Sequence, residues 1–219
     1  MRKIHDISLP LFNGMWAYRL GWENSIQEIC STASGDPSTA YRFNLCSHSG
    51  TYIETSQHKL NTKLPLDAFP LDNYFQSCTV ISIPAPERRK ISKQDFITAS
   101  THFVIPPNKA LILSTGWGQR NRDEKFISHG PFLSEELVDY LIEIRPSLLG
   151  FDLPVIDHPF EPYQAVAKLF SALPNLLLLA PLVINPTLVK TGAYELIAAP
   201  LNIQGACASL CRSFLIEVT

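Results

Sequence analysis

Residues 46–58 run Cys46-Ser-His-Ser-Gly-Thr-Tyr-Ile-Glu-Thr-Ser-Gln-His58, and the rest of the chain is organised around this stretch. The residues before it, Tyr41-Arg-Phe-Asn-Leu-Cys, are mostly aromatic or apolar and predict a strand. If that strand continues, alternation with a period of two places four residues on one face: His48, Gly50, Tyr52 and Glu54. A glycine between polar side chains on that face allows backbone or ligand to come close, which is typical of a site.

The stretch resembles the signature of the cyclase family of metal-dependent hydrolases, which includes kynurenine formamidase and isatin hydrolase. That signature has the order His-x-Gly-Thr-His-x-Asp-x-Pro-x-His. The chain matches it at His48, Gly50, Thr51 and His58. It departs from the signature at three positions, with Tyr52 in place of His, Glu54 in place of Asp and Ser56 in place of Pro.

The resemblance extends to both ends of the chain. Asp6-Ile-Ser-Leu-Pro-Leu is similar to the family's opening strand, and Tyr194-Glu-Leu-Ile-Ala-Ala-Pro-Leu is similar to its closing segment. The resemblance implies a swivelling β/β/α domain that is commonly a homodimer. It also implies a small-molecule hydrolase, with kynurenine formamidase chemistry in tryptophan catabolism as the family's best-known activity.

The composition independently favours one globular domain over residues 1–219. A chain of 219 residues with 46% hydrophobic and 17% charged residues can bury a substantial core. A net charge of -2 gives no basic surface for nucleic acid. The apolar stretch 176–184 is too short to span a bilayer, and the N-terminus lacks the apolar run of a signal peptide. Five irregularly spaced cysteines fit reduced thiols, so we expect a cytoplasmic protein without membrane contact.

Apolar runs predict strands, and capped amphipathic runs predict helices. The expected strands are 4–11, 78–83, 110–115, 148–154, 176–184, 194–201 and 213–218. Helices are expected to begin after Ser92 and Ser134, which are N-cap residues, and a third helix is expected over 161–173. This alternation predicts an α/β domain in which helices flank a mixed sheet.

The resemblance also implies a metal centre and a proton-transfer group. The family binds zinc or manganese through the first two histidines and the aspartate of the signature, together with a distant His and Glu. Its last histidine, here His58, transfers protons, and imidazole suits that task because its pKa is near neutrality. His48 matches the first ligand, and Glu54 replaces the aspartate.

The remaining ligand positions do not match the family. Tyr52 offers a neutral phenol with a pKa near 10, Tyr163 and Gln164 stand near the position of the distant His, and Ala180 stands at that of the Glu. Two ligands are too few for tight binding, because even catalytic zinc keeps three protein ligands. We therefore expect the dinuclear centre to be absent and leave the cofactor undetermined. Asp157 or His158 are possible substitute ligands, although Asp152 and Asp157 are also typical of turn caps.

A site without metal is the alternative. His48, Tyr52, Glu54 and His58 would form an acid–base set in a pocket with three tryptophan walls, Trp16, Trp22 and Trp117. Three hypotheses follow. The first is hydrolysis of an amide, ester or lactone of an aromatic or cyclic metabolite. The second is a metal-independent cyclase or dehydratase reaction, and the third is ligand binding without catalysis.

Overall fold

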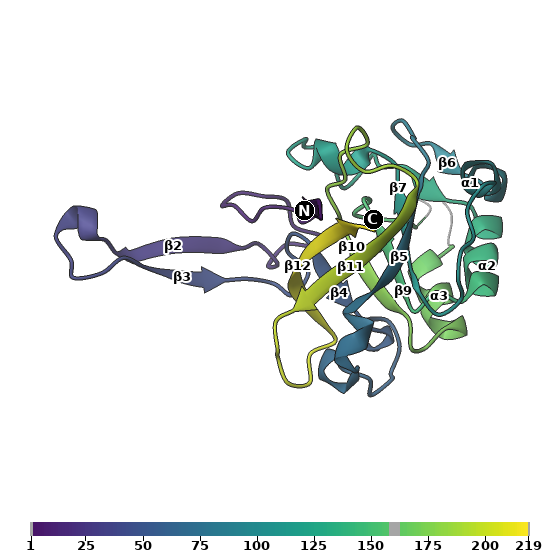
Figure 1. Ribbon diagram of the computed structural model, residues 1–219. Helices are drawn as coiled ribbons and strands as arrows, with labels where there is room; N and C mark the ends of the chain where they lie inside the picture. The colour runs from purple at the N-terminus through teal and green to yellow at the C-terminus, as the bar shows by residue number, and fades with distance from the viewer. Residues whose placement is uncertain (1, 158–162, 219) are drawn as a thin grey trace.

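The computed structural model describes residues 2–157 and 163–218, and a mixed sheet of eight strands forms its centre (Figure 1). The order across the sheet is β1, β12, β11, β5, β7, β9, β10, β4, and β4 also pairs with β12, so that the sheet closes on itself. The strands are β1 (Ile4–Asp6), β4 (Tyr52–Glu54), β5 (Phe75–Ser82), β7 (Ala110–Ser114), β9 (Leu148–Phe151), β10 (Leu177–Ala180), β11 (Gly192–Pro200) and β12 (Ala208–Glu217).

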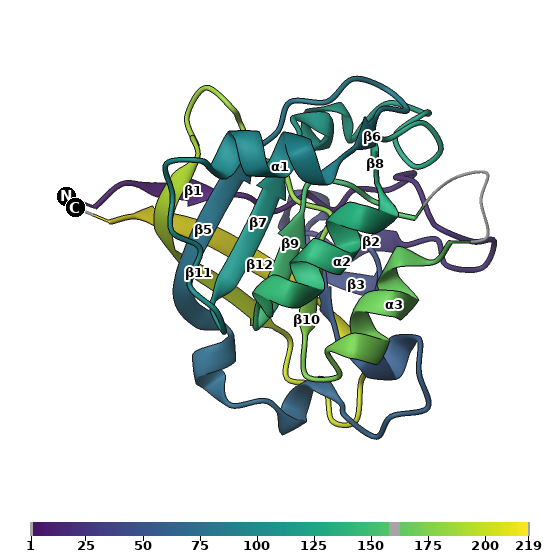
Figure 2. The ribbon, with the colours of Figure 1, turned by 90° about the vertical axis from the view of Figure 1, so that its right-hand side faces the viewer.

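Three helices cover one side of this sheet (Figure 2). They are α1 (Lys93–Ser100), α2 (Glu135–Ile144) and α3 (Ala165–Ala172). The neighbours β5, β7, β9 and β10 are parallel, and their side chains alternate between two cores. Leu111 and Leu113 of β7 pack in the core that includes the helices, whereas Ala110 and Ile112 pack in the core enclosed by the closed sheet. The predicted fold class, a mixed sheet flanked by helices, is therefore confirmed.

The predicted starts of two helices are confirmed. Ser92 accepts a hydrogen bond from the Asp95 backbone, and the Asp95 carboxylate accepts one from the Ser92 backbone, which completes a capping box before α1. Ser134 accepts from the backbone of Leu137 at the start of α2. The third prediction is wrong at its start within the described residues. Tyr163 and Gln164 precede α3, which begins at Ala165.

The predicted continuous strand from Tyr41 to Glu54 is also wrong. One strand, β3 (Ala40–Asn44), ends before the signature, and β4 begins at Tyr52 after a turn. Gly50 lies in this turn with φ of 62°, and a Cβ there would lie 2.7 Å from Leu11 Cδ2. The glycine is therefore required by both backbone conformation and close packing. His48 therefore reaches Glu54 through the turn before β4, and not by lying on the same face of one strand.

β3 belongs to an arm that leaves the body of the molecule (Figure 1). It pairs with β2 (Ser25–Cys30) in a separate two-stranded sheet. The connection between them contains a short 3₁₀ helix, η1 (Thr32–Ser34). Another small pair, β6 (Lys90–Ile91) with β8 (Phe132–Leu133), lies near α1. β3 lies where the residues from Tyr41 predict a strand, whereas its partner β2 and the projection of the pair as an arm were not predicted.

Short 3₁₀ helices complete the described connections. They are η2 (Ser56–His58), η3 (Leu66–Ala68), η4 (Leu71–Asn73) and η5 (Trp117–Arg120). Within the described ranges, the helices are all too short or too polar to cross a membrane.

Candidate active site

The strand β4 presents the signature, and it is hydrogen-bonded on both edges. Its residues pair with β10 on one side and with the first residues of β12 on the other. Thr51, just before β4, accepts a hydrogen bond at Oγ1 from the Leu9 backbone at 2.8 Å and donates one to the Pro181 carbonyl at 2.6 Å. This buried hydroxyl ties three distant segments of the chain together, so the residues that follow it have a fixed backbone.

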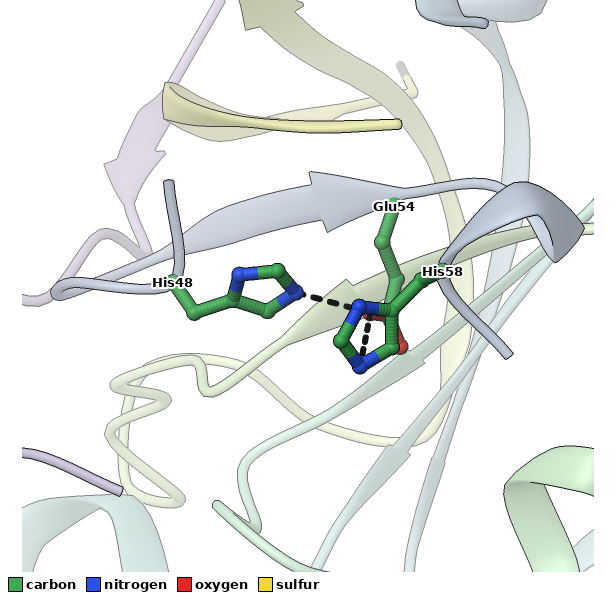
Figure 3. A group of neighbouring side chains, drawn as sticks. All are labelled: His48, Glu54 and His58. Atoms are coloured by element: carbon green, nitrogen blue, oxygen red, sulfur yellow. Dashed lines mark hydrogen bonds and ion pairs between the residues drawn. The ribbon is translucent and has the colours of Figure 1, made fainter. Parts of the chain in front are cut away.

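Three signature side chains converge at this point (Figure 3). His48 Nε2 lies 3.2 Å from Glu54 Oε2, and His58 Nε2 lies 3.7 Å from the same oxygen. His48 comes from the turn before β4, Glu54 is the last residue of β4, and His58 ends η2. His48 and Glu54 are buried, and His58 is partly buried. One carboxylate oxygen therefore faces two imidazole rings.

Aromatic and polar contacts hold the His48 ring in place. The Trp22 ring stacks against it at a centroid distance of 5.5 Å and an angle of 29°. The ring of His58 lies 4.3 Å away and that of Tyr52 lies 4.6 Å away, centroid to centroid. Ser47 Oγ is 2.9 Å from His48 Nδ1. Because the Ser47 hydroxyl occupies Nδ1, the other ring nitrogen is the one presented to Glu54.

Tyr52 begins a hydrogen-bond chain that leads away from the carboxylate. Its hydroxyl donates to Tyr18 Oη at 3.3 Å, and the Tyr18 hydroxyl donates to the Pro154 carbonyl at 2.8 Å. Burial, with the nearby Tyr18 and Glu54 adding to it, raises the pKa of Tyr52 well above its ordinary value. Burial also raises the pKa of Tyr18. Both phenols therefore stay neutral, and each proton already has an acceptor.

The environment of His58 favours the neutral imidazole. Burial lowers its pKa, and although the Glu54 carboxylate opposes this shift, the nearby His48 adds to it. A neutral ring has a free lone pair near pH 7. The ring can therefore accept a proton, as general-base chemistry requires.

A cavity of about 230 Å³ opens beside these residues. One wall is polar and includes His48, Tyr52, Glu54 and His58. The rest of the lining is largely apolar and comes from the end of β9, the segment after it, α3 and β10: Phe151, Leu153, Pro154, Val155, Ile156, Val166, Leu178 and Ala180. Arg19, Trp22 and Lys59 also line it. An apolar cavity with a few convergent polar groups is the usual form of a small-molecule site.

The three expected tryptophan walls have different positions. Trp22 lines the cavity. Trp117 does not, because it is buried in the helix-side core, where its indole N–H donates to the Phe126 carbonyl at 2.9 Å. Trp16 packs against Tyr18 and Phe126 and is held behind the cavity wall. The expectation that Trp16 and Trp117 face the ligand is therefore wrong, and Tyr18 takes that position instead.

The possible substitute ligands lie apart from the cluster or outside the described residues. Asp157 lines the cavity, but its Oδ1 accepts from the Val166 backbone at 3.2 Å in the first turn of α3. His158 lies outside the described residues. Asp152 is fully buried and accepts hydrogen bonds from the backbones of Thr115 and Gly116 and from the Thr115 hydroxyl. Both aspartates therefore act as caps.

The side chains present do not fit the family's dinuclear centre. Ala180 lies directly opposite Tyr52 in the pairing of β10 with β4, and neither offers the imidazole or carboxylate expected there. Tyr52 Oη is engaged with Tyr18, and Gln164 is exposed at the start of α3. The departures from the family pattern at positions 52 and 180 thus lie side by side in the sheet.

Two site residues were missed by sequence reasoning. Tyr18 lies between Trp16 and Trp22 in the same aromatic segment, and that position was the signal that could have identified it. Ser47 precedes His48 directly, and a hydroxyl beside a candidate ligand was a usable signal.

Comparison with known proteins agrees with this fold. The sequence pattern of the family described as "Putative cyclase" matches residues 5–158. A kynurenine formamidase of Erythrobacter litoralis (strain HTCC2594) is 27% identical over 217 residues, covering 99% of this chain and 95% of that protein.

Solved structures share the fold at lower identity. Isatin hydrolase A from Ralstonia solanacearum superimposes with a TM-score of 0.85 at 20% identity, covering 99% of this chain and 92% of that one. A "predicted metal-dependent hydrolase" from Bacillus stearothermophilus has a TM-score of 0.79 at 22% identity, with both chains covered completely. The matched pattern spans most of the chain and includes the whole signature, and so the chain belongs to the cyclase family.

Proposed function

We propose that this chain is a hydrolase that cleaves an amide, ester or lactone bond of a small aromatic or cyclic metabolite. The observation that carries the proposal is the Glu54 carboxylate facing the imidazoles of His48 and His58 at the wall of a cavity. The kynurenine formamidase and isatin hydrolase relatives support the same reaction class. N-formylkynurenine and isatin are therefore the first substrates to test.

Proton transfer at this cluster accounts for hydrolysis. His58 takes a proton from a water molecule as the water oxygen attacks the carbonyl carbon. The tetrahedral intermediate then collapses, the C–N or C–O bond breaks, and the imidazolium returns the proton to the leaving nitrogen or oxygen. Glu54 stabilises the imidazolium, because its oxygen lies 3.7 Å from His58 Nε2. His48, hydrogen-bonded to the same oxygen, fixes the carboxylate.

The cavity limits the substrate. Its apolar lining residues, such as Phe151, Leu153 and Ile156, suit a flat or apolar ring, and Trp22 lines the cavity where it stacks on His48. Arg19 lies over the Trp22 ring at 5.2 Å and, with Lys59, supplies positive charge among the lining residues. A ring that bears an anionic substituent fits this combination.

We also infer that the family's dinuclear metal centre has degenerated in this chain. Tyr52 and Ala180, which face each other across β4 and β10, support this inference because neither side chain supplies a ligand. A cytoplasmic location is part of the proposal, and five free cysteines support it.

The test measures hydrolysis of N-formylkynurenine, isatin and a set of aryl esters and lactones by purified protein and its variants. His58→Ala and Glu54→Gln are expected to lower kcat/KM on the best substrate by about a hundred- to ten-thousand-fold. The matched controls are His129→Ala and Glu195→Gln, which change the same residue types outside the cavity. These controls are expected to keep the wild-type rate.

The outcomes separate the hypotheses. Unchanged turnover in Glu54→Gln would contradict the proposed role of the cluster. Ring closure or loss of water, without a hydrolysis product, would favour a cyclase or dehydratase. Saturable binding of these compounds without any turnover would favour a ligand-binding protein. One observation supports this alternative: the Tyr52 hydroxyl donates its proton to Tyr18 and is therefore not available to a substrate.

We further propose that the chain forms a homodimer through its arm. A two-stranded hairpin alone is marginally stable in water, and this one carries exposed apolar side chains at Ile29, Tyr41 and Phe43. A groove of about 540 Å³ at its base is lined by Phe43 of the arm and by Leu201 and Leu210 of the body. A second copy supplies complementary apolar surface, because a two-fold interface uses the same patch twice.

A further inference from the structure

The cavity lining contains two cations that the proposed proton transfer does not use, Arg19 and Lys59. We propose that they form a carboxylate-binding subsite beside His58, and that the substrate is a one-ring compound whose carboxylate is adjacent to the bond that is cleaved. This inference rests on the proposed hydrolase function and deepens it. It assigns substrate selection to two side chains and gives the charged substituent a position on the ring.

The charge that is left without a partner in this lining is positive. The carboxylates of the lining are Glu54 and Asp157. Glu54 faces two imidazoles, and Asp157 accepts a hydrogen bond from the Val166 backbone at 3.2 Å. By contrast, Arg19 and Lys59 form no ion pair with a carboxylate among the residues that the structure describes. An anionic group of a ligand therefore meets two cations whose charge no described side chain neutralises.

A turn places Arg19 over the aromatic layer of the site. The Trp22 backbone donates to the Arg19 carbonyl at 3.1 Å, and the guanidinium carbon lies 5.2 Å from the centroid of the Trp22 ring. That ring in turn stacks on His48. The nearest acid along the chain, Glu23, accepts from the Gly21 backbone at 2.9 Å and does not pair with Arg19. A guanidinium held against an aromatic ring keeps its N–H fork free for a carboxylate, which it can bind through two parallel hydrogen bonds.

Lys59 brings the second cation to the same part of the cavity. It follows His58 directly at the end of η2, and its backbone N–H donates to the Ser56 carbonyl at 3.1 Å. Burial is the main cause of the lowered pKa of His58, and the positive charges of Lys59 and Arg19 add to it. Both cations are therefore close enough to act on the His58 ring. A carboxylate bound between them lies beside the bond at which His58 transfers protons.

The cavity volume limits the rest of the substrate. Since a cavity of about 150 Å³ accepts benzene, one of about 230 Å³ holds a six-membered ring with small substituents. Phe151, Leu153 and Ile156 supply apolar contacts for that ring. The small volume that remains favours a planar carboxylate over a bulkier phosphate. A carboxylate at the ring position next to the cleaved group meets both requirements, because it stays close to His58.

The first test compares the binding of benzoate and acetophenone by isothermal titration calorimetry. The two probes share a ring with a small planar substituent, differ in charge, and contain no hydrolysable bond. Wild-type protein is expected to bind benzoate about tenfold more tightly at low salt, and sodium chloride should reduce this preference. Arg19→Gln and Lys59→Gln should each lower the preference about three- to tenfold, and Arg19→Lys should lower it less, because the charge remains.

Two matched controls separate a specific subsite from the net charge of the protein. Lys63→Gln removes a cation four positions after Lys59, and Arg122→Gln removes one that lies 4.3 Å from the Phe12 ring centroid; neither residue lines the cavity. Both controls are expected to keep the wild-type preference, and thermal denaturation checks that each variant is folded. Equal affinity for the two probes, no benzoate binding at millimolar concentration, or an equal loss in the controls would overturn the proposal.

Hydrolysis is a separate readout. The probes are formanilide and phenyl acetate, each without a further substituent and with a carboxylate ortho or para to the cleaved group. The ortho carboxylate is expected to give the highest kcat/KM, and Arg19→Gln and Lys59→Gln should lower its advantage over the unsubstituted compound. Equal kcat/KM for all three compounds of a series would support the hydrolase and overturn the subsite. Benzoate preference without any turnover would support the subsite and contradict the hydrolase.

Discussion

At the scale of single residues, the two phenols beside the site make unequal contributions. Tyr52→Phe removes the donor of a 3.3 Å hydrogen bond and leaves Tyr18 Oη without a donor. Tyr18→Phe removes the acceptor of Tyr52 and the donor to the Pro154 carbonyl together. Unfolding free energy should therefore fall by about 0.5–1.5 kcal/mol in Tyr52→Phe and by about 1–3 kcal/mol in Tyr18→Phe.

Urea denaturation of both single variants and the double variant measures these values. Because the two residues share one hydrogen bond, the double variant should lose less than the sum of the two single losses. If the two losses of unfolding free energy simply add in the double variant, the Tyr52 and Tyr18 hydroxyls are not energetically coupled. Turnover of Tyr52→Phe should change less than tenfold, since the proton of Tyr52 already goes to Tyr18.

Asp152 gives the molecule a dependence of stability on pH. Burial, opposed by hydrogen bonds from Thr115 and Gly116, raises its pKa from 3.8 to about 6. Between these two values the folded protein binds more protons at this group than the unfolded chain does. Its contribution to stability therefore falls as pH rises through this window and is constant above it.

Asp152→Asn tests this dependence. Its amide hydrogens face backbone N–H donors, so the variant should be less stable by about 1–3 kcal/mol near neutral pH. The stability difference between wild type and variant should shrink as pH rises from about 4 to about 6, because only the wild type titrates there. Exposed Asp72→Asn is the control, and a difference independent of pH would contradict the shifted pKa.

Some site residues could be predicted from the sequence because their side chains have the ionisable groups that a catalytic site needs. His48 and His58 could be chosen because they match the signature, and Glu54 because it replaces the signature's aspartate, and the structure brings these three together. The pairing of Tyr18 with Tyr52 could not be predicted, because residues 34 positions apart meet through a turn. Trp117 was misassigned because an indole suits a core as well as a pocket.

At the scale of elements, the turn into β4 depends on glycine twice over. Gly50→Ala would place a Cβ 2.7 Å from Leu11 Cδ2 at a backbone φ of 62°. Gly14→Ala is the matched control, because Gly14 has a φ of 77° and nothing within 4 Å of its Cβ position. Both should lose about 1–2 kcal/mol from backbone strain, and Gly50→Ala should lose about 1–3 kcal/mol more from overpacking.

Thermal and urea unfolding of the two variants measure the difference. Shortening the neighbour, in the double variant Gly50→Ala with Leu11→Ala, should remove the steric part relative to Leu11→Ala alone. Equal losses in the two glycine variants would show that Leu11 moves aside without cost. The predicted helices after Ser92 and Ser134 were correct because their caps are local signals, whereas the close packing of the turn at Gly50 against Leu11 is a long-range contact that no local pattern shows.

At the scale of the whole molecule, the arm is the feature that concerns assembly. Phe43→Glu places a charge on a side chain that is 62% exposed at the arm and should convert the proposed dimer to monomer. Val104→Glu, at a side chain 86% exposed in a loop outside the arm, should not. Light scattering after size-exclusion chromatography at micromolar concentration decides this. A wild-type monomer would contradict the dimer.

The sequence predicted a mixed sheet flanked by helices, but it did not predict the order of the strands or the closure of the sheet. Buried apolar runs identify strands such as β7 and β9, because both their faces are covered. Strand order and closure depend on β4, which has three residues and no distinctive pattern of its own. Of the arm, β3 lies where a strand was expected from Tyr41 onward, but β2 and the pairing of the two were not predicted, because these strands have no core face to impose alternation and most of their residues are exposed.

The attachment of β4 at both edges has a consequence for how the protein is made. The Thr51 hydroxyl reaches the Pro181 carbonyl across 130 positions of sequence, and β12 lies further along the chain still. The ribosome therefore releases the signature long before its partners exist. Since such distant contacts form slowly, the site should be among the late parts of the nascent chain to gain protection from hydrogen exchange. Catalysis and the completed fold are then coupled, so a partly folded nascent chain has no working site.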